Sequence, residues 1–254
     1  MQNDTLKIYF DEAWRGPLAG PLFIWLICPI KKLSKKELEI FRDSKQLSEK
    51  VRKEHYEIIK KLEEQWKIIT ATSWMTAAEI DNYGITNSLH CAILRWMLQI
   101  IQKTYPSEFN INREILPDPV STKIKAIMKY NEIVSIFSKI EEKWIHIELK
   151  LDWNRDFWLK KSFPSWNIKT IVDWDAKIKE ISMASILAKV WRDYIMETLP
   201  KKYEKYKFDV HKWYWTLEHR KLIEKFWVSD IHRKLFLKQY FPKHTFQKKL
   251  PENF

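Results

Sequence analysis

The sequence predicts an α/β fold in which helices flank a mixed five-stranded sheet and a helical extension follows at the C-terminus. Three β-prone segments with short links occur within the first 75 residues, which indicates an antiparallel meander. Farther along the chain, helical periodicity alternates with two more strand-like segments. An antiparallel start followed by helix and strand alternation predicts one sheet that contains both kinds of strand pair.

The expected strands are marked in different ways. The first is an apolar run that ends on two adjacent acids, and the second is the apolar run after an Arg-Gly-Pro turn. The third is short and β-branched, the fourth alternates apolar and polar residues, and the fifth precedes a cluster of acids. The expected ranges are 8–12, 22–30, 67–73, 145–152 and 167–172.

Helical spacing fills the intervals between these strands. Ser48 is a predicted N-cap for a helix that continues to about Gln65. A second helix is expected over 77–103, with an interruption at residues 82–84, and a third over 124–142. A proline-containing loop precedes the third, and a last long helix ends at about residue 198.

The chain is long enough for one large domain with an appendage. It has 254 residues, of which 45% are hydrophobic, so a substantial core is expected. We predict a core over 1–200, with an insertion around 105–143. The C-terminal helical extension covers 201–254.

Charge and cysteine usage narrow the class of protein. The chain has 45 Lys and Arg residues against 33 Asp and Glu, a net charge of +12 that favours a polyanionic partner, although lysine-rich composition gives the same figure in unrelated proteins. Cys28 and Cys91 lie in apolar runs without metal-ligand spacing, which is typical of buried thiols in a reducing compartment. With no secretory or membrane-spanning apolar run, the expectation is a cytoplasmic protein without a membrane partner.

The pair Asp11-Glu12 at the end of the first strand is a candidate metal site. Neighbouring side chains on a strand point to opposite faces, so one acid can enter a cleft while the other reaches its rim. Adjacent carboxylates repel each other unless a cation or a proton lies between them, and hard divalent cations prefer oxygen ligands. The alternative is a strand end with solvated charges.

The segment that contains this pair resembles a known family. Asp-Glu-Ala-x-Arg-Gly-Pro-Leu-Ala-Gly-Pro over 11–21 is similar to the motif of type 2 ribonuclease H, ribonuclease HII. The resemblance implies a ribonuclease H-like fold. It also implies a replication and repair endonuclease that hydrolyses the RNA strand of RNA-DNA hybrids and cuts 5′ of ribonucleotides embedded in duplex DNA. Type 3 relatives have an N-terminal substrate-binding domain and usually Val in place of Ala13, so type 2 is preferred.

Two further acids correspond to family metal ligands. Asp152 in Asp-Trp-Asn resembles the family's Asp-Gly-Asn, and Asp175 in Asp-Trp-Asp-Ala-Lys resembles Gly-Asp-Ala-Lys. Asp173 is the alternative for the second of these, but the ten-residue interval from Asp175 to Ser185 matches the family's register. The resemblance therefore implies two-metal hydrolysis with Mn²⁺ or Mg²⁺ as cofactor. The implied catalytic and metal-binding residues are Asp11, Glu12, Asp152 and Asp175.

The resemblance also implies substrate contacts. Backbone groups of the Trp-Arg-Gly segment correspond to those that contact the 2′-hydroxyl, and a tyrosine in His-Lys-Trp-Tyr-Trp-Thr corresponds to one that stacks on the sugar at the RNA-DNA junction. A serine and three lysines are candidates for phosphate contacts. The implied substrate-binding residues are Trp14, Arg15, Gly16, Ser44, Lys45, Lys177, Lys212 and Tyr214. Without the motif, that tyrosine would be an equally good core residue.

The expected partners are an RNA-DNA hybrid and duplex DNA that contains ribonucleotides, bound by a monomer. Residues 247–254 at the C-terminus also resemble a sliding-clamp peptide. Short patterns of that kind recur by chance, which weakens the inference of clamp binding.

Glycine is scarce in this chain and tryptophan is abundant. There are 3 Gly and 14 Trp, whereas an average glycine content of about 7% predicts about 18 Gly. Tryptophan stands where the family resemblance expects glycine at residues 14, 153, 174, 213, 215 and 227, and residues 25 and 74 are further cases. We hypothesise that UGA codons of the gene specify glycine in the organism and have been translated as tryptophan in this sequence. Trp96 and Trp191 are candidates for genuine tryptophans.

The competing explanation is that these tryptophans are genuine. Exposed aromatic residues near a basic groove are suited to stacking on bases. Bulky side chains at residues such as 14 and 153 would crowd the expected junction site, so the chain would then be a catalytically impaired hybrid-binding protein. A third possibility is a general basic nucleic-acid binder, which would show no preference for a ribonucleotide.

Overall fold

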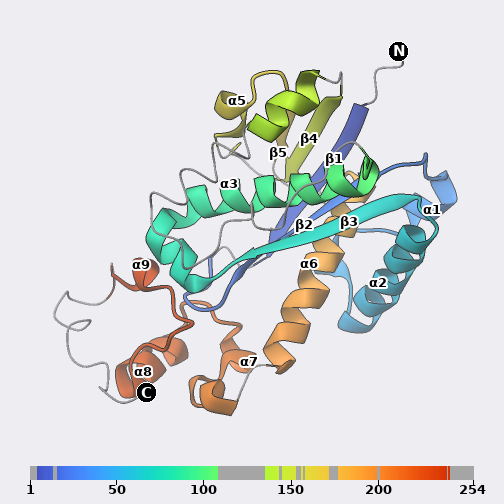
Figure 1. The fold of residues 1–254 in the computed structure, drawn as a ribbon. Coiled ribbons are helices and arrows are strands. Elements are labelled where there is room, and N and C mark those ends of the chain that lie inside the picture. The colour runs from blue at the N-terminus through green and yellow to red at the C-terminus, as the bar shows by residue number, and fades with distance from the viewer. Residues whose placement is uncertain are drawn as a thin grey trace.

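The computed structural model describes residues 5–13, 16–107, 135–142, 145–152, 156, 158–171, 177–198, 201–238 and 240. Five strands form one sheet in the order β3-β2-β1-β4-β5 (Figure 1). β1 lies at the centre, where it pairs antiparallel with β2 and parallel with β4. The predicted mixed sheet is therefore confirmed. The strands are β1 Thr5–Ala13, β2 Leu22–Pro29, β3 Ile68–Met75, β4 His146–Asp152 and β5 Asn167–Ile171.

Long helices cover both faces of the sheet (Figure 1). The long helix α3 packs on one face, and α6 packs on the other with α2 beside it. The helices are α1 Lys35–Glu39, α2 Glu49–Glu64, α3 Ala77–Thr104, α5 Leu159–Ser162, α6 Lys179–Thr198, α7 Phe208–His211, α8 Leu217–Phe226 and α9 Lys234–Leu237. The described residues also include two 3₁₀ helices, η1 Ser44–Gln46 and η4 Lys201–Tyr206, and helical residues over 135–142. Among the described residues, no helix is long and apolar enough to cross a membrane.

Local sequence signals fix several helix boundaries. The Ser48 hydroxyl accepts a hydrogen bond from the Val51 amide, which confirms the predicted N-cap of α2. Thr76 and Glu79 form a capping box at the start of α3. Gly84, with φ 75° and ψ 160°, interrupts α3 where the sequence predicted a break. Of the helix predicted over 124–142, residues 135–142 are helical and the others lie outside the described residues.

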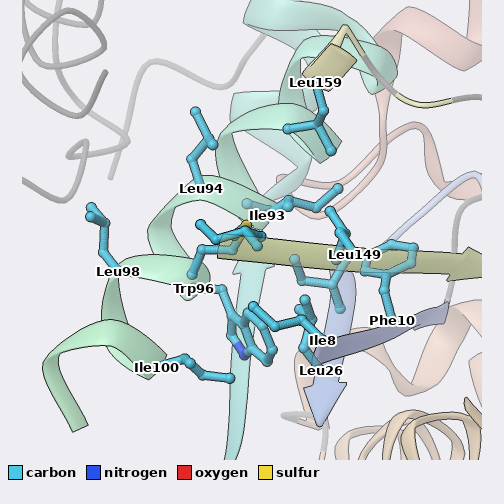
Figure 2. Close-up of a cluster of buried hydrophobic side chains, with 14 of the residues drawn as sticks. Ile8, Phe10, Leu26, Ile93, Leu94, Trp96, Leu98, Ile100, Leu149 and Leu159 are labelled. Carbon is cyan, nitrogen blue, oxygen red and sulfur yellow. The ribbon is translucent and has the colours of Figure 1, made fainter. Parts of the chain in front are cut away.

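The main core lies between the sheet and α3 (Figure 2). Ile8 and Phe10 of β1, Leu149 of β4 and Trp96 of α3 all meet there without solvent exposure. A second apolar cluster lies between the opposite face and α6 and includes Ala13. Because both faces are covered, the central strand is held rigidly and the acids at its end are fixed in place.

The C-terminal extension is anchored to the β1–β2 connection through a buried arginine. Arg233 is fully buried, and its guanidinium donates to the carbonyl oxygens of Gly20 at 2.9 Å and Pro21 at 3.0 Å. The Leu18 amide donates to the carbonyl of Trp213 at 2.9 Å, and the Gly20 amide donates to that of Ile231 at 2.7 Å. These bonds bring residues more than 190 positions apart side by side, so the extension borders the end of β1.

Some boundaries differ from the sequence prediction. The first strand begins at Thr5 and the third extends to Met75, because strand pairing continues beyond the apolar runs. The extension contains several short helical segments from η4 to α9. Most of the predicted insertion around 105–143 lies outside the described residues.

Candidate active site

Asp11 and Asp152 lie side by side at the same edge of the sheet. β1 and β4 are parallel and in register from Thr5 opposite His146 to Phe10 opposite Leu151, so the next residue of each strand is an acid. Strand alternation directs Asp11 to the face that α6 covers and Glu12 to the α3 face. The two parallel strands therefore present one carboxylate each at their carboxyl ends.

The Asp11 carboxyl is electrostatically unfavourable in its ionised form. Burial raises the pKa of Asp11 to about 7, and the negative charge of Asp152 acts in the same direction. The Ser185 hydroxyl, the Glu12 amide and the Lys189 ammonium oppose this rise by stabilising the carboxylate. A divalent cation between Asp11 and Asp152 would stabilise the ionised carboxylates, because its charge would offset both the desolvation cost of burial and the repulsion between the two acids.

A hydrogen-bonded chain from α6 and η1 supports Asp11. The Lys189 ammonium donates to the hydroxyl of Ser44, and the Ser44 and Ser185 hydroxyl oxygens are 2.7 Å apart. Since Ser185 donates to Asp11, the Ser44 hydroxyl must donate to Ser185. Ser44 is fully buried and engaged in this chain, so the exposed Lys45 is the better phosphate contact of the predicted pair.

Two predicted substrate-binding residues meet at the border of the extension. A Cβ atom built on Gly16 would lie 3.5 Å from Cε1 of the Tyr214 ring. Tyr214 is 45% exposed, so its ring is available to a ligand and does not belong to the core. Gly16 and Tyr214 are brought together by the anchoring of the extension to the β1–β2 connection.

The remaining predicted residues are less closely grouped. Lys177 and Lys212 are exposed, the first just before α6 and the second at the end of α7. Trp14, Arg15 and Asp175 lie outside the described residues, so their predicted roles stay predictions. Within the described ranges, no group of three or more His, Cys, Asp or Glu side chains is arranged to hold a metal ion.

Sequence reasoning missed the residues that support the site. Ser185 and Lys189 lie one turn apart on α6, and Lys189 also reaches the Ser185 hydroxyl at 3.4 Å. The i,i+4 spacing of a hydroxyl and a lysine was the available signal. Asp193, farther along α6, is paired with Arg192 at 2.8 Å and with Arg52 at 3.5 Å, so its carboxylate belongs to a structural ion pair.

A chain of histidines reaches the backbone of Tyr214. Nδ1 of His219 lies 2.9 Å from the Tyr214 carbonyl oxygen, and its Nε2 lies 3.2 Å from Nε2 of His232. Nδ1 of His232 accepts from the Ser229 amide at 2.9 Å. Burial lowers the pKa of His219 to about 4 and that of His232 to about 3, so both rings are neutral at pH 7.

Comparison with known proteins identifies the family. The family model described as Ribonuclease HII matches residues 8–149 and 154–239. The chain belongs to the ribonuclease HII family. It is 33% identical over 230 residues to the ribonuclease HII of Fusobacterium nucleatum, which covers 90% of this chain and 84% of that protein. It is also 33% identical over 233 residues to the ribonuclease HII of Campylobacter jejuni, which covers 92% and 91% of the two chains.

Solved structures confirm the ribonuclease H-like fold. The ribonuclease HII in a PCNA complex from Archaeoglobus fulgidus has a TM-score of 0.56 and 17% identity, and the match covers 98% of both chains. The ribonuclease H2 of Pyrococcus horikoshii has a TM-score of 0.54 and 21% identity, covering 91% of this chain and 93% of that one. Family membership makes this chain a ribonuclease H, an endoribonuclease that acts on RNA-DNA hybrids.

The described residues fit the divalent metal that the family implies. The donors at the sheet edge are carboxylate oxygens, which hard cations such as Mg²⁺ and Mn²⁺ prefer. The burial of the Asp11 carboxyl beside a second acid, Asp152, favours a cation there. The residues that would hold the metal are therefore Asp11 and Asp152, with Glu12 and Asp175 as predicted additional ligands.

Proposed function

We propose that this chain, with glycine at residues 14, 153, 174, 213 and 215, cuts duplex DNA on the 5′ side of an embedded ribonucleotide, in addition to hydrolysing RNA in RNA-DNA hybrids. The single observation that carries the proposal is that two acids of neighbouring parallel strands adjoin at the end of β1, while the connection that follows β1 places Gly16 against a half-exposed tyrosine. One part of this arrangement is suited to phosphodiester hydrolysis. The other is suited to recognition of the sugar where RNA meets DNA.

The acids supply the hydrolytic half of the site. Two bound Mg²⁺ or Mn²⁺ ions would activate the attacking water and offset the charge that develops on the phosphate. Asp11 and Asp152 would hold the ions, and the chain from Lys189 through Ser44 and Ser185 would keep the Asp11 carboxylate oriented. The expected product ends are a 3′-hydroxyl and a 5′-phosphate.

Gly16 and Tyr214 supply the recognition half. Without a side chain, Gly16 leaves space for a sugar to approach the backbone, whose polar groups can bond a 2′-hydroxyl. The Tyr214 ring offers an apolar face to the deoxyribose that follows. Lys45, Lys177 and Lys212 are exposed cations that would hold phosphates, and this predicts salt-dependent affinity.

Sliding-clamp binding through residues 247–254 remains a prediction, since this segment lies outside the described residues. The Archaeoglobus ribonuclease HII was solved with PCNA, which supports the idea for this chain through a shared fold alone.

The test compares two proteins on a DNA duplex that contains one ribonucleotide, with Mn²⁺. One is the chain as written, and the other is the glycine variant, which carries Gly at residues 14, 153, 174, 213 and 215. We expect the glycine variant to cut 5′ of the ribonucleotide and the tryptophan chain to be inactive, because indole rings crowd the junction. Absence of cleavage by both proteins with Mn²⁺ and with Mg²⁺ contradicts the proposed function. Equal cleavage by both contradicts only the crowding argument.

A further inference from the structure

Tryptophan occupies backbone conformations that favour glycine. Among the described residues, six that are not glycine have positive φ, and four of them are tryptophan. The four are Trp66 at 52°, Trp158 at 67°, Trp213 at 69° and Trp227 at 64°. Side chains with a Cβ atom rarely adopt this region, and bulky ones least of all. Tryptophan is only 14 of the 254 residues, so its share of these positions demands a specific cause.

Trp66 stands at the glycine position of a helix C-cap. Helix α2 has its C-cap at Gln65, and Trp66 follows in the left-handed conformation. The Trp66 amide donates to the Glu63 carbonyl at 2.9 Å, and the Lys67 amide donates to the Leu62 carbonyl at 3.0 Å. These two bonds define a Schellman motif, in which the left-handed residue is usually glycine. The indole itself is 59% exposed, so packing does not explain its presence.

Trp227 and Trp158 follow the same pattern. Trp227 ends α8 with φ 64° and ψ −177°, a region that is essentially restricted to glycine. Its side chain is 51% exposed. Trp158 precedes α5 with φ 67° and ψ 4°, makes no capping hydrogen bond through its side chain, and is 56% exposed. In both cases the backbone conformation favours glycine, and the exposed ring gains little stabilisation from packing.

Other tryptophans are ordinary core residues. Trp96 lies inside α3 and is fully buried in the main core (Figure 2). Trp166 is 6% exposed and stacks on Phe163, with ring centroids 4.1 Å apart. Neither has positive φ. The tryptophans of the described residues therefore include one class that fits a glycine backbone and another that fits a tryptophan environment.

We propose that the native chain carries glycine at residues 66, 158, 213 and 227, because UGA codons of its gene are read as glycine, and that residues 96 and 166 are genuine tryptophans encoded by UGG. The inference extends the family comparison, which flagged residues 213 and 227, to residues 66 and 158, where only the backbone conformation points to glycine. It is independent of the proposed function, because it depends on backbone dihedral angles and, at residues 66, 158 and 227, on the exposure of the side chain. Trp213 is fully buried, and its assignment depends on its positive φ and on the family comparison.

Peptide mass spectrometry of the protein purified from its source organism tests the assignment. Tryptic peptides 62–67 and 226–233 are expected to have the masses of glycine-containing peptides, whereas peptides 96–103 and 162–169 are expected to retain tryptophan. In the gene, the first two peptides should contain UGA and the other two UGG. Tryptophan at residue 66 or 227 of the native protein, or glycine at residue 96 or 166, would overturn the proposal.

Thermal unfolding of the recombinant chain tests the same assignment without protein from the source organism. Trp66→Gly and Trp227→Gly should each raise Tm by about 2–4 °C, since they relieve positive-φ strain at exposed positions. The matched controls Trp96→Gly and Trp166→Gly should lower Tm, because they empty a packed core site. A fall in Tm at residues 66 and 227 comparable to that of the controls would contradict the conformational argument.

A second inference concerns the histidine chain and depends on the proposed role of Tyr214. A carbonyl oxygen only accepts, so Nδ1 of His219 donates to Tyr214. Nε2 of His219 must then accept from Nε2 of His232, whose Nδ1 in turn accepts from the Ser229 amide. These hydrogen bonds are all satisfied when both rings are neutral, with the proton on Nδ1 of His219 and on Nε2 of His232. We infer that His219 is a positioning residue that holds the Tyr214 backbone in the orientation needed at the substrate junction.

The test exploits the geometry of the imidazole. In the glycine variant, His219→Asn keeps an N–H donor near the position of Nδ1, whereas His219→Gln places its amide near Nε2 and leaves the Tyr214 carbonyl without this donor. We expect His219→Gln to reduce kcat/KM at a single ribonucleotide about tenfold or more, because small displacements of positioning groups are costly, while His219→Asn restores most of it. Cleavage of a continuous RNA-DNA hybrid should change less.

Tyr214→Ala is the reference in the same assay. If Tyr214→Ala leaves single-ribonucleotide cleavage unchanged, the proposed role of Tyr214 is wrong. If Tyr214→Ala reduces cleavage but His219→Gln and His219→Asn behave alike, the positioning inference is wrong and the proposed function stands. Tm measured for both His219 variants separates a positioning effect from a loss of stability, because both remove the same buried ring.

Discussion

Replacing Asp11 by asparagine in the glycine variant is expected to reduce cleavage of a single-ribonucleotide duplex by about 10³-fold or more, since a metal-binding carboxylate contributes several kcal/mol to the transition state. Asparagine has nearly the same shape and keeps the hydrogen-bond capacity for Ser185, but it lacks the charge that would hold a cation. The assay is kcat/KM with Mn²⁺ or Mg²⁺. Asp209→Asn makes the same charge change on an exposed residue of α7 and should leave cleavage nearly unchanged.

The same substitution should not damage the fold. The pKa of Asp11 is raised to about 7 in the folded protein from an ordinary value of 3.8. Protonated Asp11 therefore favours the folded state at low pH, and this contribution is lost as the pH rises through 7. In metal-free protein, Asp11→Asn should become progressively more stable relative to the parent between pH 4 and pH 7. An inactive variant that is less stable at pH 7 would mean that activity was lost through unfolding.

Trp96→Ala is expected to destabilise the protein by about 3–5 kcal/mol, the cost of emptying a large aromatic site in a packed core. Trp96 is fully buried in the main core, the cluster that also contains Ile8 and Phe10 (Figure 2). Urea unfolding measures the change. The matched control is Trp66→Ala, which removes an exposed ring and keeps a Cβ atom in the same left-handed conformation, so its effect should stay within about 0.5 kcal/mol. Similar losses in both variants would contradict the assignment of Trp96 to the core and of Trp66 to a glycine position.

Much of the sheet could be predicted from the sequence because its signals are local. The apolar run before Asp11 and the alternation before Asp152 marked the two central strands that carry the acids. Ser48 and Gly84 marked a helix start and a helix interruption, and both predictions are confirmed. These features depend on periodicity and capping, which act over a few residues.

The residues that hold the site in place could not be predicted in this way, because they contact residues that are distant in the sequence. Arg233 bonds the carbonyls of Gly20 and Pro21 across more than 200 residues, and no local pattern records that contact. The burial of Ser44 against Ser185 likewise depends on how η1 packs beside α6. The left-handed conformation of Trp66 was missed because the residue type itself argues against it.

We propose that acids from separate strands converge to hold divalent ions beside the scissile ribonucleotide. The decisive experiment is a crystal structure of the glycine variant with Mn²⁺ and a duplex containing one ribonucleotide, with anomalous scattering to locate the metal. We expect Mn²⁺ bound by carboxylate oxygens of both Asp11 and Asp152, with the phosphate 5′ of the ribonucleotide against the metal and the Tyr214 ring on the adjoining deoxyribose. Mn²⁺ bound elsewhere, or an Asp11 carboxylate that contacts no metal while substrate is bound, would contradict it.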